Sequence, residues 1–187
     1  MSAALNARDA RFSQLVKVKV GTGRTAGYRM ATSEQLNAWR AAGRIVLETE
    51  RYGNTYAVDR VDLDAMRAAG GIPVVHMGSL AHLRSFLGAV GEPWLCVLLW
   101  VPRAVCAARS AGRGDRDTEE RLRVWDATLE DLSTAGPDET LFHLLLRTDL
   151  RAPAETAEAV ANGADGERPK SGRELVAFLR ERTSVDL

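Results

Sequence analysis

Apolar and polar positions in the first half of the chain predict a mixture of strands and helices. The segment LVKVKV (residues 15–20) alternates strictly between apolar and basic side chains, which is typical of a strand with one exposed face. Thr32 and Gln35 have the spacing of a capping box, which predicts the start of a helix. The other expected elements are a loop at 21–27, a helix ending at Gly43, strands at 44–50 and 55–58 with a turn at Gly53-Asn54, and a short helix at 62–69.

The second half alternates regularly between apolar strands and helices. Strands are expected at 72–77, 94–101 and 141–149, and helices at 79–88, 103–112, 118–132 and 154–162. In the helix at 118–132, one face carries Leu122, Trp125, Leu129 and Leu132. Continuous apolar strands imply burial on both faces, and therefore a parallel sheet flanked by helices. The pattern predicts a doubly wound α/β fold with a small hairpin subdomain inserted near its front.

Length and charge limit the classes of protein that the chain can represent. Its 187 residues suffice for one compact domain, which we place at residues 1–160. A polar linker and a C-terminal helix, capped by Ser171 and Glu174, follow at 161–187. The formal net charge is zero, so we expect no attraction to nucleic acid or membranes as partners.

The chain has no sequence feature that directs it into or across a membrane. No stretch reaches the roughly 20 apolar residues of a membrane span, and the N-terminus lacks an apolar signal core. Cys96 and Cys106 lie in apolar surroundings without metal-ligand spacing, which favours structural thiols in a reducing compartment. We therefore expect a cytoplasmic protein without a metal site of its own.

Two arginine-containing segments and one histidine are candidates for anion chemistry. GTGRTAG (21–27) matches no phosphate-loop motif and predicts a loop that presents Arg24. The segment 109–123 carries five arginines around a glycine-containing turn, namely Arg109, Arg113, Arg116, Arg121 and Arg123. These could clamp a polyphosphate, or they could form a solvated surface that nearby acids neutralise. His76 ends an apolar strand, at the edge where doubly wound sheets bind ligands, although a structural role is the simpler alternative.

The hairpin segment around YGNTY combines a carboxylate with tyrosines. Glu48 precedes Tyr52 and Tyr56, in a chain with three tyrosines altogether. A carboxylate accepts two hydrogen bonds side by side, which suits N1–H and the exocyclic amine of guanine. Tyrosine hydroxyls suit phosphate oxygens, and their rings can stack on a base. The alternative is a hairpin whose tyrosines have no ligand.

The order of these segments resembles that of the guanylate kinase family over roughly residues 15–160. The matching pieces are an arginine loop leading to Tyr28, the GRIVLE segment (43–48), YGNTY (52–56), RSAGRG (109–114) followed by a charged helix, and RTD (147–149). The resemblance implies a P-loop-kinase-like α/β fold. Its subdomain for the acceptor nucleotide would lie at about 21–70 and its lid at about 109–123.

The resemblance also implies roles for individual residues. Glu48 would recognise guanine, while Arg24, Tyr28 and Tyr56 would hold the acceptor phosphate. Lys19 or Lys17 would replace a further phosphate-binding arginine of the family. Arg113 and Arg121, with Arg109, would stabilise the phosphoryl group during transfer.

Several positions depart from the family pattern. The first strand and the P-loop, GxxxxGK[ST], do not occur in the sequence, so either the site for the donor nucleotide is missing or the chain is truncated at its N-terminus. His76 stands where the family has a functional aspartate, and Ala57-Val58 replace Gly-Ser. Without its first strand the sheet has exposed edges, which predicts a homodimer through such an edge.

Three functions remain open on this basis. The first is a binding protein with a partly retained GMP site and without ATP-dependent phosphoryl transfer. The second is an active kinase for nucleoside monophosphates or another small molecule, which would need ATP and Mg²⁺. The third is an interaction module whose former acceptor surface binds a phosphorylated or acidic partner.

Overall fold

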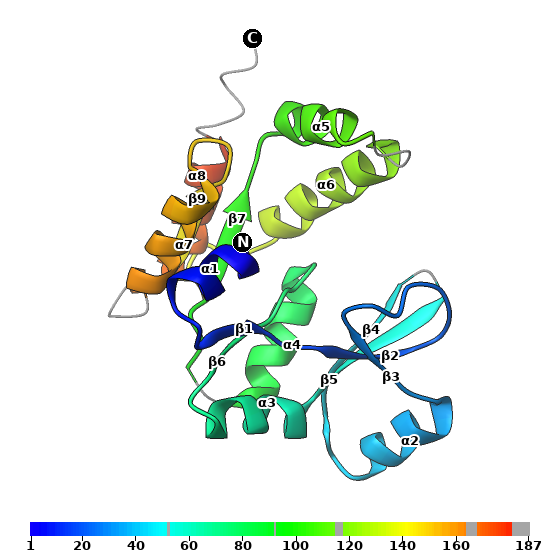
Figure 1. Cartoon of the computed structure of the whole chain (residues 1–187). Helices are drawn as coiled ribbons and strands as arrows, with labels where there is room; N and C mark the ends of the chain where they lie inside the picture. The colour runs from blue at the N-terminus through cyan, green and yellow to red at the C-terminus, as the bar shows by residue number, and fades with distance from the viewer. Residues whose placement is uncertain (52, 92, 115–117, 164–167, 181–187) are drawn as a thin grey trace. The chain divides into compact units, whose positions relative to one another are not determined.

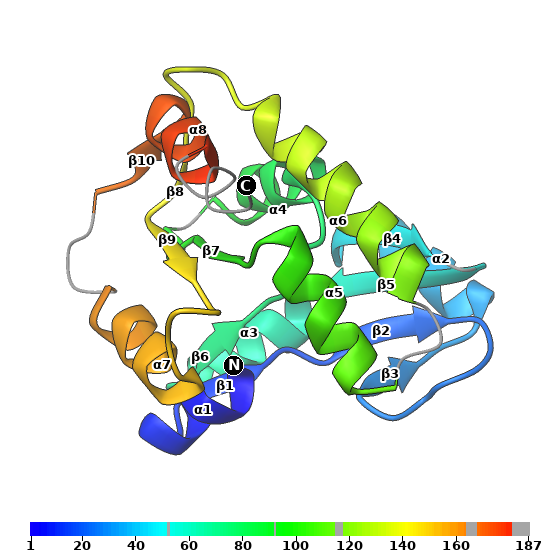
Figure 2. The ribbon, with the colours of Figure 1, turned by 90° about the horizontal axis from the view of Figure 1, so that it is seen from above.

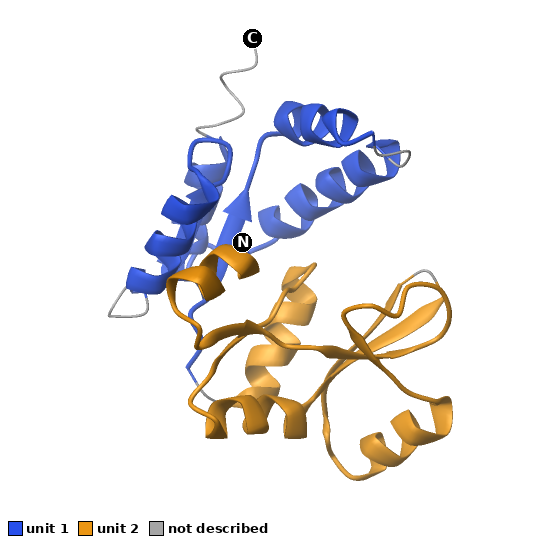
Figure 3. Ribbon diagram, in the orientation of Figure 1, with its two compact units in different colours: residues 1, 93–187 blue, residues 2–92 orange. Residues whose placement is uncertain are grey.

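A computed structural model describes residues 1–51, 53–91, 93–114, 118–163 and 168–180. The chain divides into two compact units, coloured separately in Figure 3: unit 1 contains residues 1 and 93–187, and unit 2 contains residues 2–92. Parts of the predicted linker and lid lie outside the described residues. Tyr52 and Arg116 also lie outside them.

Unit 2 contains four helices and six strands among its described residues (Figure 1). They are α1 (Ser2–Arg8), β1 (Phe12–Gln14), β2 (Lys17–Val20), β3 (Tyr28–Met30), α2 (Ser33–Ala41), β4 (Ile45–Arg51), β5 (Asn54–Asp59), α3 (Arg60–Ala68), β6 (Ile72–Val74) and α4 (Leu80–Val90). β1 pairs with β6 in parallel. The expected helices and the β4–β5 hairpin are present, with end points that differ by a few residues.

The four-stranded sheet of unit 2 has the order β3-β2-β5-β4. β2 is parallel to β3 and antiparallel to β5, which in turn is antiparallel to β4. Strand β3 was not predicted, because β2 and β3 are joined by only the seven residues 21–27, whereas parallel neighbours usually need a longer crossover. The strand predicted at 15–20 is also shorter, since Leu15 and Val16 lie between β1 and β2.

One face of this sheet packs on α2. Val18 and Ala57 are each 1 % exposed and form a buried cluster with Leu36 of α2. The capping box at Thr32 and Gln35 is confirmed: the Thr32 hydroxyl accepts from the Gln35 N–H, and the Gln35 side chain accepts from the Thr32 N–H. The alternation of β2 therefore places its valines on the face that packs on α2 and its lysines on the opposite face.

Unit 1 contains four helices and four strands among its described residues (Figure 2). They are β7 (Val97–Trp100), α5 (Arg103–Gly112), α6 (Thr118–Ser133), β8 (Thr140–Phe142), β9 (Leu144–Arg147), α7 (Pro153–Asn162), β10 (Lys170–Ser171) and α8 (Gly172–Arg180). β7 is parallel to β9. On α6, Trp125 packs against Trp100 with ring centroids 4.9 Å apart and donates to the Val101 carbonyl.

The predicted parallel sheet is present as two parallel pairs, β1-β6 in unit 2 and β7-β9 in unit 1. Among the described residues, β6 and β7 each have one paired edge. Residues 168–180, which the sequence assigns to a tail, belong to unit 1, where β10 pairs antiparallel with β8. The architecture is therefore the expected mixed α/β class, with the C-terminal helix integrated into a unit.

No helix within the described ranges is both long enough and apolar enough to cross a lipid bilayer.

Candidate ligand-binding site

The register of the four-stranded sheet places most of the predicted phosphate-binding side chains of unit 2 on one face. Lys17 is opposite Tyr28, and Lys19 is opposite Tyr56. Paired residues of adjacent strands share a face, as do residues two apart on one strand. Lys17, Lys19, Tyr28 and Tyr56 therefore lie together, on the face opposite to that covered by α2. We call this face the tyrosine face.

Two tyrosine rings form the centre of the tyrosine face. The ring centroids of Tyr28 and Tyr56 are 5.2 Å apart, and the ring planes are inclined at 53°. Both side chains are partly buried, and neither hydroxyl has a hydrogen-bond partner among the residues that the structure describes. Both hydroxyls can therefore donate to a ligand without breaking a hydrogen bond to a described residue.

Lys19 is buried beneath the tyrosine pair. The residue is only 2 % exposed, and its Nζ donates to the carbonyl oxygens of Thr22 and Arg24 at 2.6 and 2.9 Å. The same nitrogen lies 5.6 and 5.8 Å from the two tyrosine ring centroids, within the range of cation–π attraction. Lys19 thus contacts the loop and the rings that surround it, and its predicted contact with a substrate remains a prediction.

The loop at 21–27 is fixed from a second side by the hairpin. The Asn54 side-chain oxygen accepts from the Thr22 N–H at 2.8 Å. Gly21 has a φ of +135°, and a Cβ there would approach the same Asn54 oxygen to 2.2 Å, so glycine is required at this position. Arg24 projects from this loop, where its Nε donates to the Ala26 carbonyl and its terminal nitrogens have no partner within the described ranges.

We expect Lys19→Met to loosen this loop without unfolding the protein. The change removes both donors, leaving the Thr22 and Arg24 carbonyls unsatisfied at a cost of about 1–3 kcal/mol. Amide hydrogen exchange of residues 21–27 should accelerate by at least about tenfold, because the loop then opens more often. Lys17→Met, on the same strand and face, is the matched control and should leave exchange in this loop unchanged. Equal exchange in wild type and Lys19→Met would contradict this role.

Glu48 lies on the other face of the sheet. It is opposite Ala57, whose side chain packs towards α2, whereas Tyr56 is opposite Thr49. The Arg40 guanidinium of α2 donates to both carboxylate oxygens of Glu48, at 2.8 and 2.5 Å. The structure therefore does not bring Glu48 together with the tyrosine pair. Recognition of guanine by Glu48 remains a prediction that the sequence resemblance alone supports.

His76 follows β6 and lies close to the base of β2. Lys17 donates its Nζ hydrogen to the His76 carbonyl at 2.9 Å, and the His76 Nε2 is 3.1 Å from the Ser2 hydroxyl. Burial, followed by the positive charge of Lys17, lowers the pKa of His76 below its ordinary value. Burial likewise lowers the pKa of Lys17. Strands β2 and β6 thus bring these two basic residues together. The sequence did not indicate this contact, because the residues are 59 positions apart.

The three arginines predicted to act in phosphoryl transfer lie in unit 1, and each is exposed. Arg109 donates to the backbone carbonyl of Thr148 at 2.8 Å and lies 3.4 Å from its hydroxyl. Arg113 is the C-terminal cap of α5, and Arg121 lies on α6. The buried Ser110 hydroxyl is 2.9 Å from that of Thr118, which connects α5 to α6. Their catalytic roles remain predictions.

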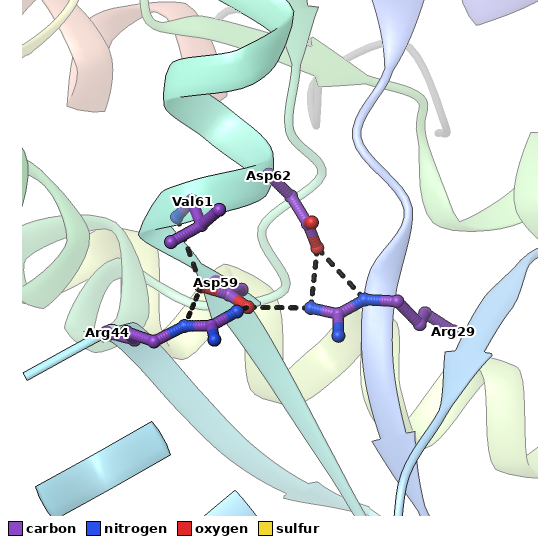
Figure 4. Close-up of polar contacts among 5 residues, drawn as sticks. All are labelled: Arg29, Arg44, Asp59, Val61 and Asp62. Atoms are coloured by element: carbon purple, nitrogen blue, oxygen red, sulfur yellow. Dashed lines mark hydrogen bonds and ion pairs between the residues drawn. The ribbon is translucent and has the colours of Figure 1, made fainter. Parts of the chain in front are cut away.

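An ionic network centred on the buried Asp59, which the sequence analysis did not predict, lies beside the sheet (Figure 4). The Asp59 side chain is 0 % exposed, caps α3 through the Val61 N–H, and accepts hydrogen bonds from Arg29 at 2.7 Å and from Arg44. Arg29 also binds Asp62 at 2.7 Å. Burial would raise the pKa of Asp59, but hydrogen bonds from Arg44, Val61 and Arg29 outweigh it and lower the pKa. A helix beginning after Asp59 is the signal that could have revealed its capping role.

Other features of the described residues add no further site. A shallow hollow of about 270 Å³ at the hairpin end is lined by Glu50, Arg51, Gly53, Asn54 and Thr55, none of which was predicted to bind a ligand. Across the described ranges, no three His, Cys, Asp or Glu side chains gather so that they could hold a metal ion.

Comparison with known proteins supports the fold. The crystal structure of guanylate kinase from Anaplasma phagocytophilum matches with a TM-score of 0.59 and 17 % sequence identity. The match covers 97 % of this chain and 91 % of that chain. No family model matches, and neither does any curated protein. The protein therefore has a guanylate kinase-like fold, a class that the strand pairs and the hairpin sheet had already indicated.

Proposed function

We propose that this guanylate kinase-like protein binds a nucleoside monophosphate on the tyrosine face, as a binding protein with a partly retained acceptor site. The observation that carries the proposal is that the hydroxyls of two partly buried residues, Tyr28 and Tyr56, have no partner among the described residues. They lie on a face whose lysines, Lys17 and Lys19, form no ion pair with a carboxylate within the described ranges.

The chemistry of this face suits a phosphate group. Each phenol can donate one hydrogen bond to an anionic oxygen, and Arg24 can add a planar pair of donors from the loop. The alternation that places Lys17 and Lys19 on the tyrosine face places Glu48 and Glu50 on the other. A cationic side chain without a nearby carboxylate, such as Lys17, favours a dianionic phosphate over a neutral ligand.

The base of the nucleotide is assigned from the sequence resemblance, which favours GMP. Glu48, the carboxylate that would recognise guanine, is bound by Arg40. Glu48 could contact a base on the tyrosine face only after leaving that ion pair and the face that it occupies. Phosphate binding on this face therefore does not depend on Glu48, and we assign the main binding energy to the phosphate.

A Glu48→Gln variant separates the two assignments. Because Glu48 faces α2, the ratio of GMP affinity to AMP affinity should stay within about threefold of the wild-type ratio. Calorimetric titration of both nucleotides measures that ratio, and Glu50→Gln is the matched control on the same strand and face. A loss of preference for GMP in Glu48→Gln alone would show that Glu48 leaves Arg40 and recognises the base.

ATP and magnesium belong to this site only through the family resemblance. Among the described residues no three His, Cys, Asp or Glu side chains gather to hold a metal ion, and the sequence holds no GxxxxGK[ST] motif. We assign no step to ATP or magnesium.

Calorimetric titration of the full chain with GMP, AMP and guanosine tests the proposal. Both monophosphates should bind, and guanosine at least about 100-fold more weakly, because it lacks the phosphate that the tyrosine face would hold. Equal affinity for guanosine and GMP, or binding of neither nucleotide, would overturn it. ADP production in the presence of ATP, magnesium and GMP would add phosphoryl transfer to the binding function.

A further inference from the structure

We infer that Lys17 and His76 form a second anion subsite beside the tyrosine face, so that the ligand carries two anionic groups. This inference rests on the proposed function, because the first group would be the phosphate held by Tyr28 and Tyr56. The second would be another phosphate or a carboxylate. We call the pair Lys17 and His76 the basic corner.

The basic corner is built from two segments far apart in the sequence. Lys17 opens β2, and His76 lies just beyond β6, whose parallel partner is β1. The contact between the Lys17 Nζ and the His76 carbonyl, at 2.9 Å, brings them together at the carboxyl end of a parallel strand pair. This edge of α/β sheets is where ligands commonly bind.

No described carboxylate neutralises the positive charge of Lys17 in the basic corner. Neither Lys17 nor His76 forms an ion pair among the residues described, where their polar partners are a backbone carbonyl and the Ser2 hydroxyl. Lys17 uses one of its three N–H donors for that carbonyl, which leaves two for a ligand. Burial and the charge of Lys17 lower the pKa of His76, and an anion bound beside both residues would offset the effect of Lys17.

The position of the corner fits a ligand that also contacts the tyrosine pair. Lys17 is the register partner of Tyr28 on the neighbouring strand and shares its face. Tyr56 is opposite Lys19, which is two residues from Lys17 and therefore about 6.6 Å further along the strand. A nucleoside with phosphates at both its 5′ and 3′ positions presents two anionic groups at a comparable separation.

The test compares GMP with guanosine 3′,5′-bisphosphate by calorimetric titration of the full chain. Wild type should bind the bisphosphate at least about tenfold more tightly than GMP. In Lys17→Met the ratio of the two affinities should fall to about one, whereas the matched variant His82→Gln should retain the wild-type ratio. Equal affinities in wild type, or a ratio that survives Lys17→Met, would overturn the second subsite while leaving the proposed function intact.

If no nucleotide binds, the proposed function fails. Anion binding at the basic corner can then still be measured with inorganic phosphate. The ring proton signals of His76, assigned by their loss in His76→Gln, are followed by NMR during titration with inorganic phosphate. They should shift in wild type and stay in place in Lys17→Met. An unchanged His76 signal in wild type, at phosphate concentrations up to tens of millimolar, would overturn the inference.

Discussion

Replacing Asp59 with alanine should lower the free energy of unfolding by about 3–5 kcal/mol, because it leaves two partly buried guanidinium groups without their shared carboxylate. Arg29 and Arg44 both bind this side chain, which is 0 % exposed and also caps α3. A loss of that size is a large fraction of the 5–15 kcal/mol that typically stabilises a domain. Urea denaturation, with hydrogen exchange of the β4 and β5 amides as the local readout, measures it.

Asp64→Ala is the matched control for Asp59→Ala. Asp64 lies on the same helix, is exposed, and has no partner among the described residues, so its removal should change stability by less than about 0.5 kcal/mol. If Asp59→Ala does not fold, Asp59→Asn, which retains an acceptor for the Val61 N–H, allows the measurement at smaller cost. A loss of stability in Asp59→Asn no larger than that in Asp64→Ala would contradict a structural role for the network.

The same network gives a pH dependence whose sign follows from the lowered pKa of Asp59. Burial opposes that shift, and the hydrogen bonds from Arg44, Val61 and Arg29 exceed it. The folded-state pKa therefore lies below the ordinary value of 3.8, so this stabilisation is complete above that value and is lost as pH falls through the folded-state pKa. The stability of wild type should fall more steeply below about pH 4 than that of Asp59→Asn. Parallel curves would exclude the contribution.

Replacing both tyrosines with phenylalanine should abolish most of the phosphate affinity. A hydrogen bond to a charged group contributes about 1.5–3 kcal/mol, so loss of the Tyr28 and Tyr56 hydroxyls should weaken GMP binding by at least about 100-fold. The rings, which are in contact at 5.2 Å, remain in place. Calorimetric titration of wild type, the two single variants and the double variant measures the change.

Stability provides the internal control for the tyrosine variants. Neither hydroxyl has a partner among the described residues, so the double variant should unfold within about 0.5 kcal/mol of wild type. A large loss of stability would indicate that the hydroxyls serve the fold. GMP affinity within threefold of wild type would remove the tyrosine pair from the site.

Local patterns in the sequence were sufficient to predict several parts of this fold. The capping box at Thr32, the hairpin and the alternation of β2 depend on neighbours within a few residues, so they are visible without tertiary information. Alternation also separates Glu48 from Tyr56: any two-residue turn in this hairpin pairs Tyr56 with an odd-numbered residue of β4, and the observed partner is Thr49.

Other parts depend on contacts between distant residues that local patterns do not specify. The seven-residue loop between β2 and β3 is held by Lys19 and Asn54. Because both strands are short, this loop is long enough to run back along β2 and start β3 in parallel to it. Arg29 and Asp59 are separated by 30 positions and meet only once the sheet has formed. The burial of Lys19 arises from the same tertiary contacts, and the sequence pattern did not indicate it.

A crystal structure of the chain with GMP would show whether the tyrosine face holds the phosphate of a nucleoside monophosphate. We expect phosphate oxygens within about 2.5–3.0 Å of the Tyr28 and Tyr56 hydroxyls, the range for O–H···O hydrogen bonds. Arg24 should approach the same phosphate from the loop. A phosphate bound elsewhere, with both hydroxyls left to solvent, would contradict the account.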